Sequence, residues 1–258
     1  MSNPIKIAVI GLGEVSGQLA HNLKSAGADV VGFDQVKPKF PPVPLAQSLE
    51  EAVDDADIVL TLTSSLASLR TAETVAKTLK PGAIYADLNS GTPSLKRKLG
   101  GLLPSGSFAD VAVMNEVLAV SGQAAERLVE TLGAFGISLE FVSDSPGDAA
   151  ARKLVRLLLD QGIASVLADT LWAAKSLGMD DWAITEIREL LGGASETTVQ
   201  NYLDDTGKHG KQYSVAMGDV SEMLAEAGHE STTINGISLT MSHIMHGRRI
   251  PFADLSGD

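Results

Sequence analysis

Near its start the chain reads Ile5-Lys6-Ile7-Ala8-Val9-Ile10-Gly11-Leu12-Gly13-Glu14-Val15-Ser16, an apolar run that ends in a Gly-x-Gly turn. Apolar residues at helical spacing follow at once, from Val15 to Leu23. In such a strand–turn–helix unit the first glycine makes the tight turn, and the second lets the backbone come close to a phosphate. The helix N-terminus offers free N–H groups and a partial positive charge. The stretch therefore predicts a site for the pyrophosphate of a dinucleotide, built from Gly11, Leu12, Gly13, Glu14 and Val15.

An acidic residue follows at the distance that ribose binding requires. Asp34 lies about 20 residues after Gly13, at the end of the apolar run Val30–Phe33. A carboxylate there accepts hydrogen bonds from the ribose 2′-OH and repels a 2′-phosphate, so we expect NAD as the cofactor in preference to NADP. The pattern departs from the usual fingerprint in one respect, because Ser16 stands where a third glycine is usual.

Composition and charge exclude several classes of protein. The 258-residue chain is 44% hydrophobic and 20% charged, which is ordinary for a globular enzyme. Its net charge of −12 disfavours nucleic acid and anionic membranes, so we expect neither as a partner. It has no cysteine, which rules out disulfides and thiolate metal sites and is typical of a cytoplasmic protein. We also expect no membrane span and no signal peptide, because long apolar runs are missing and the first strand begins at once.

Short β-rich runs alternate with helical patterns through the first half of the chain, which predicts an α/β fold with a doubly wound, mainly parallel sheet. The expected strands are Ile5–Ile10, Asp29–Phe33, Ile58–Leu62, Ile84–Leu88, Ser107–Val111 and Ile137–Val142. The expected helices between them are Val15–Ala26, Leu49–Val53, Leu66–Leu79, Ser94–Leu99 and Gln123–Phe135.

After Val142 only helical patterns remain. The expected helices are Asp148–Ser176, Trp182–Leu191, Glu196–Leu203, Tyr213–Ala227 and Ile234–Met245. We therefore predict a dinucleotide-binding domain over residues 1–144 and an all-helical domain over residues 145–258. The apolar segment Leu154–Leu177 is too long for the helices of one chain to cover all round, so we also expect a homodimer built through the helical half.

Four motifs together resemble the β-hydroxyacid dehydrogenase and 6-phosphogluconate dehydrogenase superfamily over nearly the whole chain. They are similar to the family's cofactor, strand-end, substrate and catalytic-lysine motifs and read Gly11–Ala20 (GLGEVSGQLA), Asp87–Pro93 (DLNSGTP), Phe108–Val117 (FADVAVMNEV) and Gly147–Lys153 (GDAAARK). The resemblance implies a Rossmann domain, a long interdomain helix and a helical C-terminal domain. It also implies an NAD(P)-dependent oxidoreductase that acts on a small-molecule hydroxyacid, alcohol or carbonyl compound.

The resemblance assigns roles to particular residues. Lys153 aligns with the catalytic lysine, and apolar neighbours would lower its pKa toward that of a useful general acid/base. Asn89 and Ser90 follow a strand, where polar groups can meet nicotinamide and substrate; the alternative is a turn or cap before Pro93. The further implied cofactor contacts are Thr63 and Ser64, and the further implied substrate contacts are Met114, Asn115, Glu116 and His209.

Two departures keep other functions open. Met114-Asn115-Glu116 replaces the Ser-Gly-Gly that binds substrate in the family, and Leu157 replaces an asparagine that assists the lysine. The pattern is closer to a branch of phosphogluconate dehydrogenase-like NAD-binding proteins. A dinucleotide-binding sensor or assembly protein with little turnover is therefore one alternative, and an imine reductase-like enzyme is another.

Two further groups of side chains have simpler interpretations. The histidines lack the tight spacing of metal ligands, so we expect no metal site. His209 is interpreted as part of a loop between two helices, where it either contacts substrate or is merely exposed. Lys96-Arg97-Lys98 is interpreted as a solvated helix face.

Overall fold

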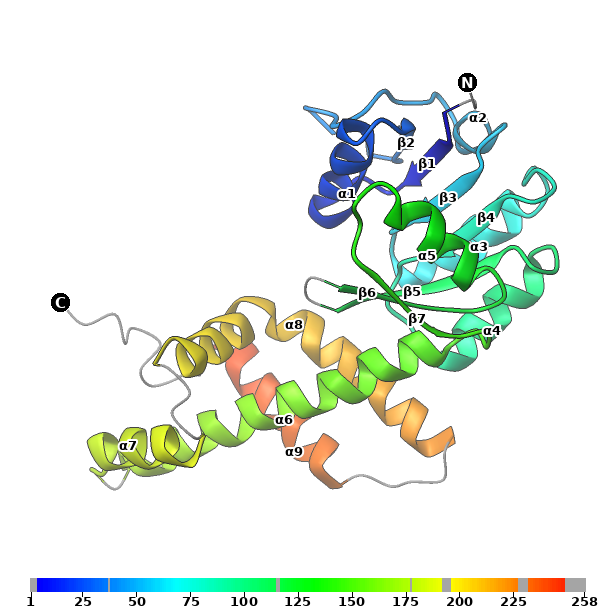
Figure 1. Cartoon of the computed structure of the whole chain (residues 1–258). Helices are drawn as coiled ribbons and strands as arrows, with labels where there is room; N and C mark the ends of the chain where they lie inside the picture. The colour runs from blue at the N-terminus through cyan, green and yellow to red at the C-terminus, as the bar shows by residue number, and fades with distance from the viewer. Residues whose placement is uncertain are drawn as a thin grey trace. The chain divides into compact units, whose positions relative to one another are not determined.

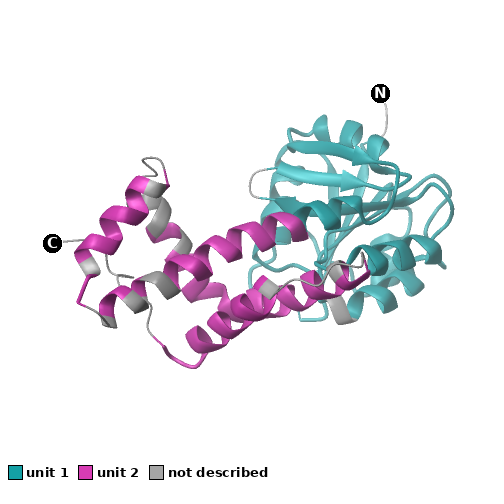
Figure 2. Cartoon of the chain, turned by 90° about the horizontal axis from the view of Figure 1, so that it is seen from below, with its two compact units in different colours: residues 1–153 teal, residues 154–258 magenta. Residues whose placement is uncertain are grey.

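The computed structural model describes residues 4–36, 38–114, 117–176, 178–191, 196–226 and 232–248. The chain divides into two compact units, Met1–Lys153 (unit 1) and Leu154–Asp258 (unit 2), which Figure 2 colours separately. The division falls inside the long helix α6 (Asp148–Ser176), so its first residues belong to unit 1. The predicted domains, 1–144 and 145–258, placed the boundary just before this helix.

Unit 1 is built on one seven-stranded sheet with the strand order β2-β1-β3-β4-β5-β6-β7. The strands are β1 (Lys6–Ile10), β2 (Asp29–Phe33), β3 (Ile58–Thr61), β4 (Ile84–Asp87), β5 (Phe108–Met114), β6 (Val117–Ser121) and β7 (Leu139–Ser143). The helices of this unit before α6 are α1 (Glu14–Ser25), α2 (Leu49–Val53), α3 (Ser65–Val75), α4 (Pro93–Leu102) and α5 (Ala125–Gly133) (Figure 1). All neighbouring strands are parallel except β5 and β6. The predicted α/β fold with a doubly wound, mainly parallel sheet and a helical second half is confirmed.

Helices cover both faces of the sheet because its central strands are apolar on both sides. In β1, Ile7 and Val9 pack in one cluster with α1 and α5. The alternate residues Ala8 and Ile10 pack in a second cluster with α2, α3 and α4. Parallel strands buried in this way read as continuous apolar runs, which is why the strands could be predicted from the sequence.

The order of the strands reverses between β1 and β3, which are neighbours in the sheet. The chain passes from β1 outward to β2 and then returns to form β3 on the other side. Such a reversal opens a crevice outside the carboxyl ends of the two strands, where ligands bind in open α/β sheets. The Gly11–Gly13 turn follows β1 and residues 62–64 follow β3, so both lie at this edge.

One strand was not predicted. β6 runs antiparallel to β5, with Met114 opposite Val117. Residues 115 and 116 lie outside the described residues, and as the pair Asn-Glu they carry no hairpin signature of the Asn-Gly kind. The alternation of strands and helices also favoured parallel neighbours. The predicted strand Ser107–Val111 is correspondingly longer in the structure, as β5.

Unit 2 contains the rest of α6 with α7 (Asp180–Leu190), α8 (Glu196–Glu226) and α9 (Thr232–Met245). One apolar cluster lies around Leu171 and Leu203, and a second lies around Met217 and Met241. Among the described residues, none of the helices is long and apolar enough to cross a membrane.

Helix α8 corrects the prediction of two helices separated by a loop at residues 207–211. Gly207 and Gly210 suggested the loop, but a glycine inside a helix costs only about 1 kcal/mol. The apolar clusters that α8 joins on either side of these glycines outweigh that cost. His209 therefore lies in a helix, and its interpretation as a loop residue was wrong.

Candidate functional site

The turn between β1 and α1 forms the first part of the site. Gly11 has φ +85°, and a Cβ on it would lie 2.2 Å from the carbonyl oxygen of Leu62, so no other residue fits there. A Cβ at Gly13 would meet no described atom closer than Ser16 Oγ at 4.0 Å. Gly13 is the N-cap of α1, and no side-chain hydrogen bond caps this end among the described residues. The open space and the uncapped N–H groups fit the phosphates of a dinucleotide.

The carboxylate of Asp34 lies against the same turn. Its Oδ2 accepts a hydrogen bond from the N–H of Leu12 at 2.6 Å, and its Oδ1 accepts one from the N–H of Val36 at 2.9 Å. The side chain is half-buried, and each carboxylate oxygen keeps a second lone pair that can accept from a hydroxyl group. This geometry suits the predicted contact with the adenosine ribose.

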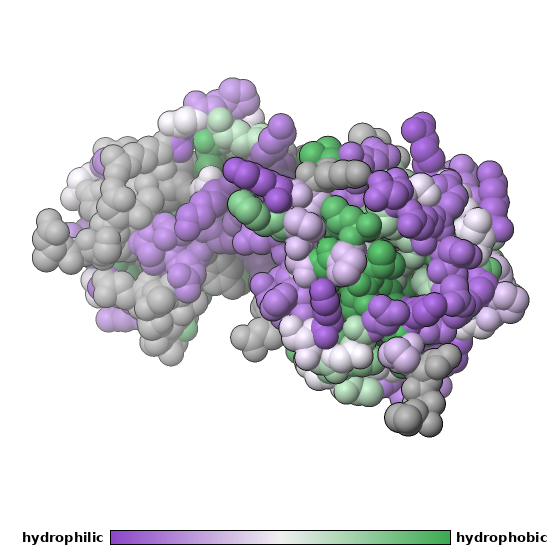
Figure 3. Space-filling view, turned by 90° about the horizontal axis from the view of Figure 1, so that it is seen from above, coloured by the Kyte–Doolittle hydropathy of each residue, from purple (hydrophilic) through white to green (hydrophobic). Residues whose placement is uncertain are grey.

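Several large apolar side chains of unit 1 are exposed, and two of them, Val15 and Val36, lie within two residues of Gly13 and Asp34. Among the side chains that the structure describes in unit 1, the large apolar ones that are more than half exposed are Val15, Val36 and Phe40. Figure 3 shows hydrophilic side chains over much of the surface in this view, as the net charge of −12 leads one to expect, with groups of apolar side chains between them. Val36, whose N–H binds Asp34, offers an exposed apolar surface that suits the flat face of a base.

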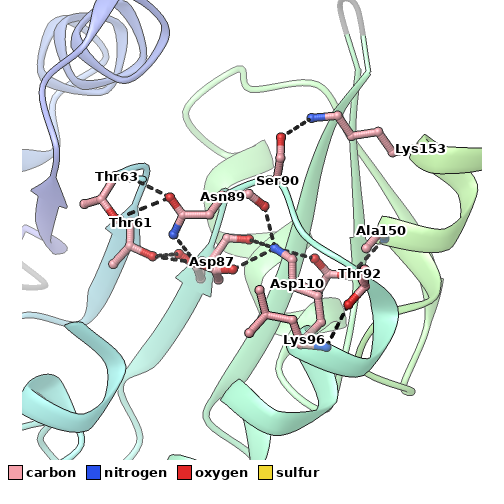
Figure 4. A network of polar contacts seen from close by, with 12 residues as sticks. Thr61, Thr63, Asp87, Asn89, Ser90, Thr92, Lys96, Asp110, Ala150 and Lys153 are labelled. Carbon is pink, nitrogen blue, oxygen red and sulfur yellow. Dashed lines mark hydrogen bonds and ion pairs between the residues drawn. The ribbon is translucent and has the colours of Figure 1, made fainter. Parts of the chain in front are cut away.

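Asn89 connects the ends of two neighbouring strands. Its Oδ1 accepts a hydrogen bond from the N–H of Thr63 at 2.6 Å, and its Nδ2 donates to Asp87 Oδ1 at 2.5 Å (Figure 4). The side chain is buried, and its amide is held by these contacts on both sides. Asn89 therefore fixes the position of the backbone at Thr63, beside the crevice between β1 and β3.

The side chains of Lys153 and Ser90 contact each other. The Nζ of Lys153 donates to Ser90 Oγ at 3.4 Å, as the close-up in Figure 4 shows. Burial lowers the pKa of Lys153, and the positive charge of Lys96 lowers it further, while Asp110 acts in the opposite direction. A lysine with a lowered pKa next to a hydroxyl group can exchange a proton with a bound alcohol or carbonyl group.

The start of α6 is held close to the sheet, which explains the position of Lys153. Gly147 has φ +101°, and a Cβ on it would lie 2.7 Å from the carbonyl oxygen of Pro93. The N–H of Ala149 donates to Ser121 Oγ at 2.9 Å, and the N–H of Ala150 donates to an oxygen of Asp110 at 2.9 Å. These contacts satisfy helix N–H groups that otherwise lack partners. Glycine at 147 is thus a packing requirement, and it sets where Lys153 lies.

The interpretation of residues 96–98 as a solvated helix face holds for Arg97 and Lys98, which are exposed, but was wrong for Lys96. Its side chain is only 1% exposed, and its Nζ lies 2.7 Å from Asp87 Oδ2 and 3.1 Å from Asp110 Oδ1. Nζ also donates to the carbonyl oxygen of Asn89 at 2.7 Å. Burial opposes the charged form of Lys96, but the two carboxylates outweigh it and raise its pKa. Sequence reasoning missed this buried group of Lys96, Asp87 and Asp110.

A signal for this group is nevertheless present in the sequence. Lys96 lies at helical spacing from Leu99 and Leu103, which are buried, so it falls on the apolar side of α4. Asp87 and Asp110 end or interrupt apolar runs that form buried strands. Buried carboxylates need a partner, and a lysine on the inner face of the next helix is the natural one.

The remaining residues predicted to contact cofactor or substrate in unit 1 lie on different elements. Glu14 and Ser64 are exposed at the starts of α1 and α3. Met114 is half-buried at the end of β5, and residues 115 and 116 lie outside the described residues. Among the residues that the structure describes, no group of three or more His, Asp or Glu side chains could hold a metal ion.

His209 belongs to unit 2, whereas the site residues described above belong to unit 1. Its Nδ1 lies 2.9 Å from Asp205 Oδ1, and its ring packs edge-on against Tyr213 at a centroid distance of 6.1 Å. Tyr213 also donates to Asp205. The three side chains follow one face of α8 at spacings of four residues.

One comparison with known protein families matches most of unit 1. Residues 6–127 match the family described as the NAD binding domain of 6-phosphogluconate dehydrogenase. The match runs from β1 into α5 and includes the Gly11–Gly13 turn, Asp34 and Asn89. Over these residues, unit 1 is similar to NAD-binding domains of this type.

Other relatives match over most of the chain. An uncharacterised 28.5 kDa protein from Methanothermus fervidus is 26% identical over 211 residues, which are 78% of this chain and 80% of that protein. A conserved hypothetical protein from Sinorhizobium meliloti 1021 is 25% identical with a TM-score of 0.79, covering 97% of this chain and 92% of the other.

Two enzymes share the fold at lower identity. The 3-hydroxyisobutyrate dehydrogenase of Mycobacterium tuberculosis, solved with L-serine, has a TM-score of 0.79 at 18% identity and covers 96% of each chain. An imine reductase from Myxococcus stipitatus, solved with NAD⁺, has a TM-score of 0.62 at 18% identity and covers 98% of each chain.

Proposed function

We propose that the chain is a member of the β-hydroxyacid dehydrogenase superfamily and an NAD(P)-dependent oxidoreductase that acts on a small hydroxyacid, alcohol or related carbonyl compound; its similarity to NAD binding domains of 6-phosphogluconate dehydrogenase and the fold that it shares with a 3-hydroxyisobutyrate dehydrogenase support this. The observation that carries the proposal is the contact of the Lys153 amine with Ser90. Ser90 follows β4 and the dinucleotide turn follows β1, so both lie at the carboxyl edge of the parallel strands. A proton-exchanging amine close to a cofactor crevice is what hydride transfer to or from a carbon–oxygen bond requires.

Each part of unit 1 has a role in this proposal. Gly11, Gly13 and the start of α1 hold the pyrophosphate, and Asp34 holds the ribose. Asn89 holds the strand ends in place. The nicotinamide, when bound, supplies or accepts the hydride.

Lys153 moves the proton. In the oxidising direction its Nζ accepts the proton of the substrate hydroxyl, and in the reducing direction it returns a proton to the carbonyl oxygen. Its lowered pKa brings both forms within reach nearer to neutral pH. Ser90, which accepts a hydrogen bond from Nζ, orients the amine toward the substrate.

The proposal is tested by incubating the protein with NADH or NADPH and a panel of carbonyl acids, aldehydes and cyclic imines while following nicotinamide absorbance. Turnover of a carbonyl acid or aldehyde supports it. Turnover of cyclic imines alone would instead support the imine reductase-like alternative, which the shared fold favours. Tight cofactor binding without any turnover would support a dinucleotide sensor.

We expect NADH to bind more tightly than NADPH, by about tenfold or more, because the Asp34 carboxylate repels a 2′-phosphate. Calorimetric titration with both cofactors measures the difference. Asp34→Asn is the matched variant, because its amide oxygen can still accept a hydrogen bond from the N–H of Leu12 while the negative charge is gone. This variant should show a smaller difference in affinity between NADH and NADPH. Tighter NADPH binding by the unaltered protein would mean that a nearby cation such as Lys39 captures the phosphate instead.

We also expect a homodimer formed through α6. Val155, Leu159 and Val166 are 55%, 60% and 64% exposed, and their spacing places them on one face of the helix. Light scattering at micromolar concentration should give the mass of two chains, and Leu159→Glu should give one. Val36→Glu places the same charge at an exposed apolar site of unit 1 and should leave the dimer intact. A monomer mass for the unaltered protein would refute this expectation.

A further inference from the structure

Lys96 is a buried charge for which the reaction proposed above has no use. We propose that Lys96 is a positioning residue for Lys153: it holds the Lys153–Ser90 contact together and supplies a buried, fixed positive charge that acts on the Lys153 amine. This inference rests on the proposed acid/base role of Lys153, and it adds the group that prepares that role.

One set of contacts runs from Lys96 to Ser90. The Lys96 Nζ donates to the carbonyl oxygen of Asn89 at 2.7 Å and to that of Asp87 at 3.2 Å (Figure 4). Ser90, the next residue in the chain, accepts the hydrogen bond from Lys153. Lys96 therefore fixes the backbone on which the hydroxyl partner of Lys153 is carried.

A second set of contacts runs from Lys96 to the helix that carries Lys153. Asp110 binds Lys96 through Oδ1 at 3.1 Å and accepts the N–H of Ala150 through Oδ2 at 2.9 Å. Ala150 lies in the first turn of α6, one turn before Lys153. The ammonium group of Lys96 is thus connected to both members of the Lys153–Ser90 contact.

The charges near Lys153 oppose one another. Lys96 on α4 lowers the pKa of Lys153, whereas Asp110 on β5 raises it. Asp87, on β4, is bound to Lys96 and completes the buried group. Removing the cation and removing the anion should therefore shift the pKa of Lys153 in opposite directions.

The ionisable neighbours of Lys153 on α6 have partners of their own. Arg152 is paired with Glu140 at 2.7 Å, and Asp148 accepts from Ser143 Oγ at 2.6 Å. Both contacts are exposed, where charge effects are weak because water and salt screen them. The buried Lys96 and Asp110 therefore dominate the charge that Lys153 senses.

The test measures the pKa of Lys153 directly in the full-length protein. Competitive acetylation with acetic anhydride over a range of pH, read by mass spectrometry of the Lys153 peptide, follows its free-amine fraction. Four variants are compared with the unaltered protein. These are Lys96→Met, Lys96→Arg, Asp110→Asn and, as an exposed control on the same helix, Lys98→Met.

Lys96→Met should raise the pKa of Lys153, which lowers the free-amine fraction and therefore the labelling at neutral pH. Because the free-amine fraction of a mostly protonated lysine falls by about tenfold when its pKa is higher by one, the loss of labelling measures the change directly. Asp110→Asn should lower the pKa and increase the labelling. Lys96→Arg keeps the charge and should stay close to the unaltered protein, and Lys98→Met should change nothing.

A purely structural role predicts a different result. If Lys96 and Asp110 only held the fold, both Lys96→Met and Asp110→Asn would expose Lys153 and raise its pKa together. An unchanged or raised pKa in Asp110→Asn would overturn the inference, even if Lys96→Met failed to fold. Since acetylation needs no turnover, this result is independent of whether the proposed enzymatic function holds.

Discussion

Lys153→Ala is expected to lower the turnover of the true substrate by about 10²–10⁴-fold, the usual loss when a general acid/base is removed. Its affinity for the cofactor should stay within a few-fold, because the pyrophosphate is assigned to Gly11, Gly13 and the start of α1. Steady-state kinetics gives the first quantity, and calorimetric titration with NADH gives the second. A large loss of turnover with unchanged cofactor binding is the combination that marks a proton-transfer group.

Lys153→Arg is the matched control for this prediction. It keeps the positive charge, but the guanidinium group does not release a proton near neutral pH, so it should rescue little activity. If Lys153→Ala turned over the true substrate at the normal rate, the lysine would be structural. The acid/base role would then pass to another group, and Glu116 is the first candidate.

The lowered pKa of Lys153 also gives this prediction a pH signature. In the oxidising direction the amine must be unprotonated, so kcat/KM should rise with pH through that pKa. In the reducing direction the ammonium form is needed, so the activity should fall over the same range. The rise in the oxidising direction and the fall in the reducing direction should both occur at lower pH than the titration of an ordinary lysine. Both pH dependences should be lost in Lys153→Ala.

Features determined by local spacing could be predicted from the sequence. The bounds of β2 and of α6 agree with the predicted Asp29–Phe33 and Asp148–Ser176, because each segment combines a clear apolar pattern with turn residues before it. The Gly11–Gly13 turn was recognisable for the same reason. The open space at Gly13 could not be predicted from the sequence, because it depends on how far the side chains of other segments lie from Gly13 in the folded chain.

Features that depend on distant partners could not be predicted in the same way. Lys96 lies in a run of basic residues in the sequence and resembles a solvated face until Asp87 and Asp110 are brought to it from two strands. The antiparallel placement of β6 depends on its pairing with β5, to which no local residue pattern pointed. The continuity of α8 through Gly207 likewise depends on packing at both of its ends.

The paired variants Gly11→Ala and Gly13→Ala are expected to separate folding from cofactor binding. At Gly11 a Cβ meets the carbonyl oxygen of Leu62 at 2.2 Å, and φ of +85° is unfavourable for alanine. We expect Gly11→Ala to destabilise the protein by about 3 kcal/mol or more and to lower its unfolding temperature by roughly 10 °C. Thermal unfolding without cofactor measures this effect.

Gly13→Ala should behave in the opposite way. Its φ of −70° suits alanine, and a Cβ would meet no described atom closer than 4.0 Å, so the unfolding temperature should stay near that of the unaltered protein. The added methyl group would nevertheless fill the space that the pyrophosphate needs. NADH affinity should therefore fall by about tenfold to a hundredfold, measured by calorimetric titration. Normal NADH binding by a stable Gly13→Ala variant would show that the phosphates do not approach this turn, and the assignment of the crevice between β1 and β3 would have to be abandoned.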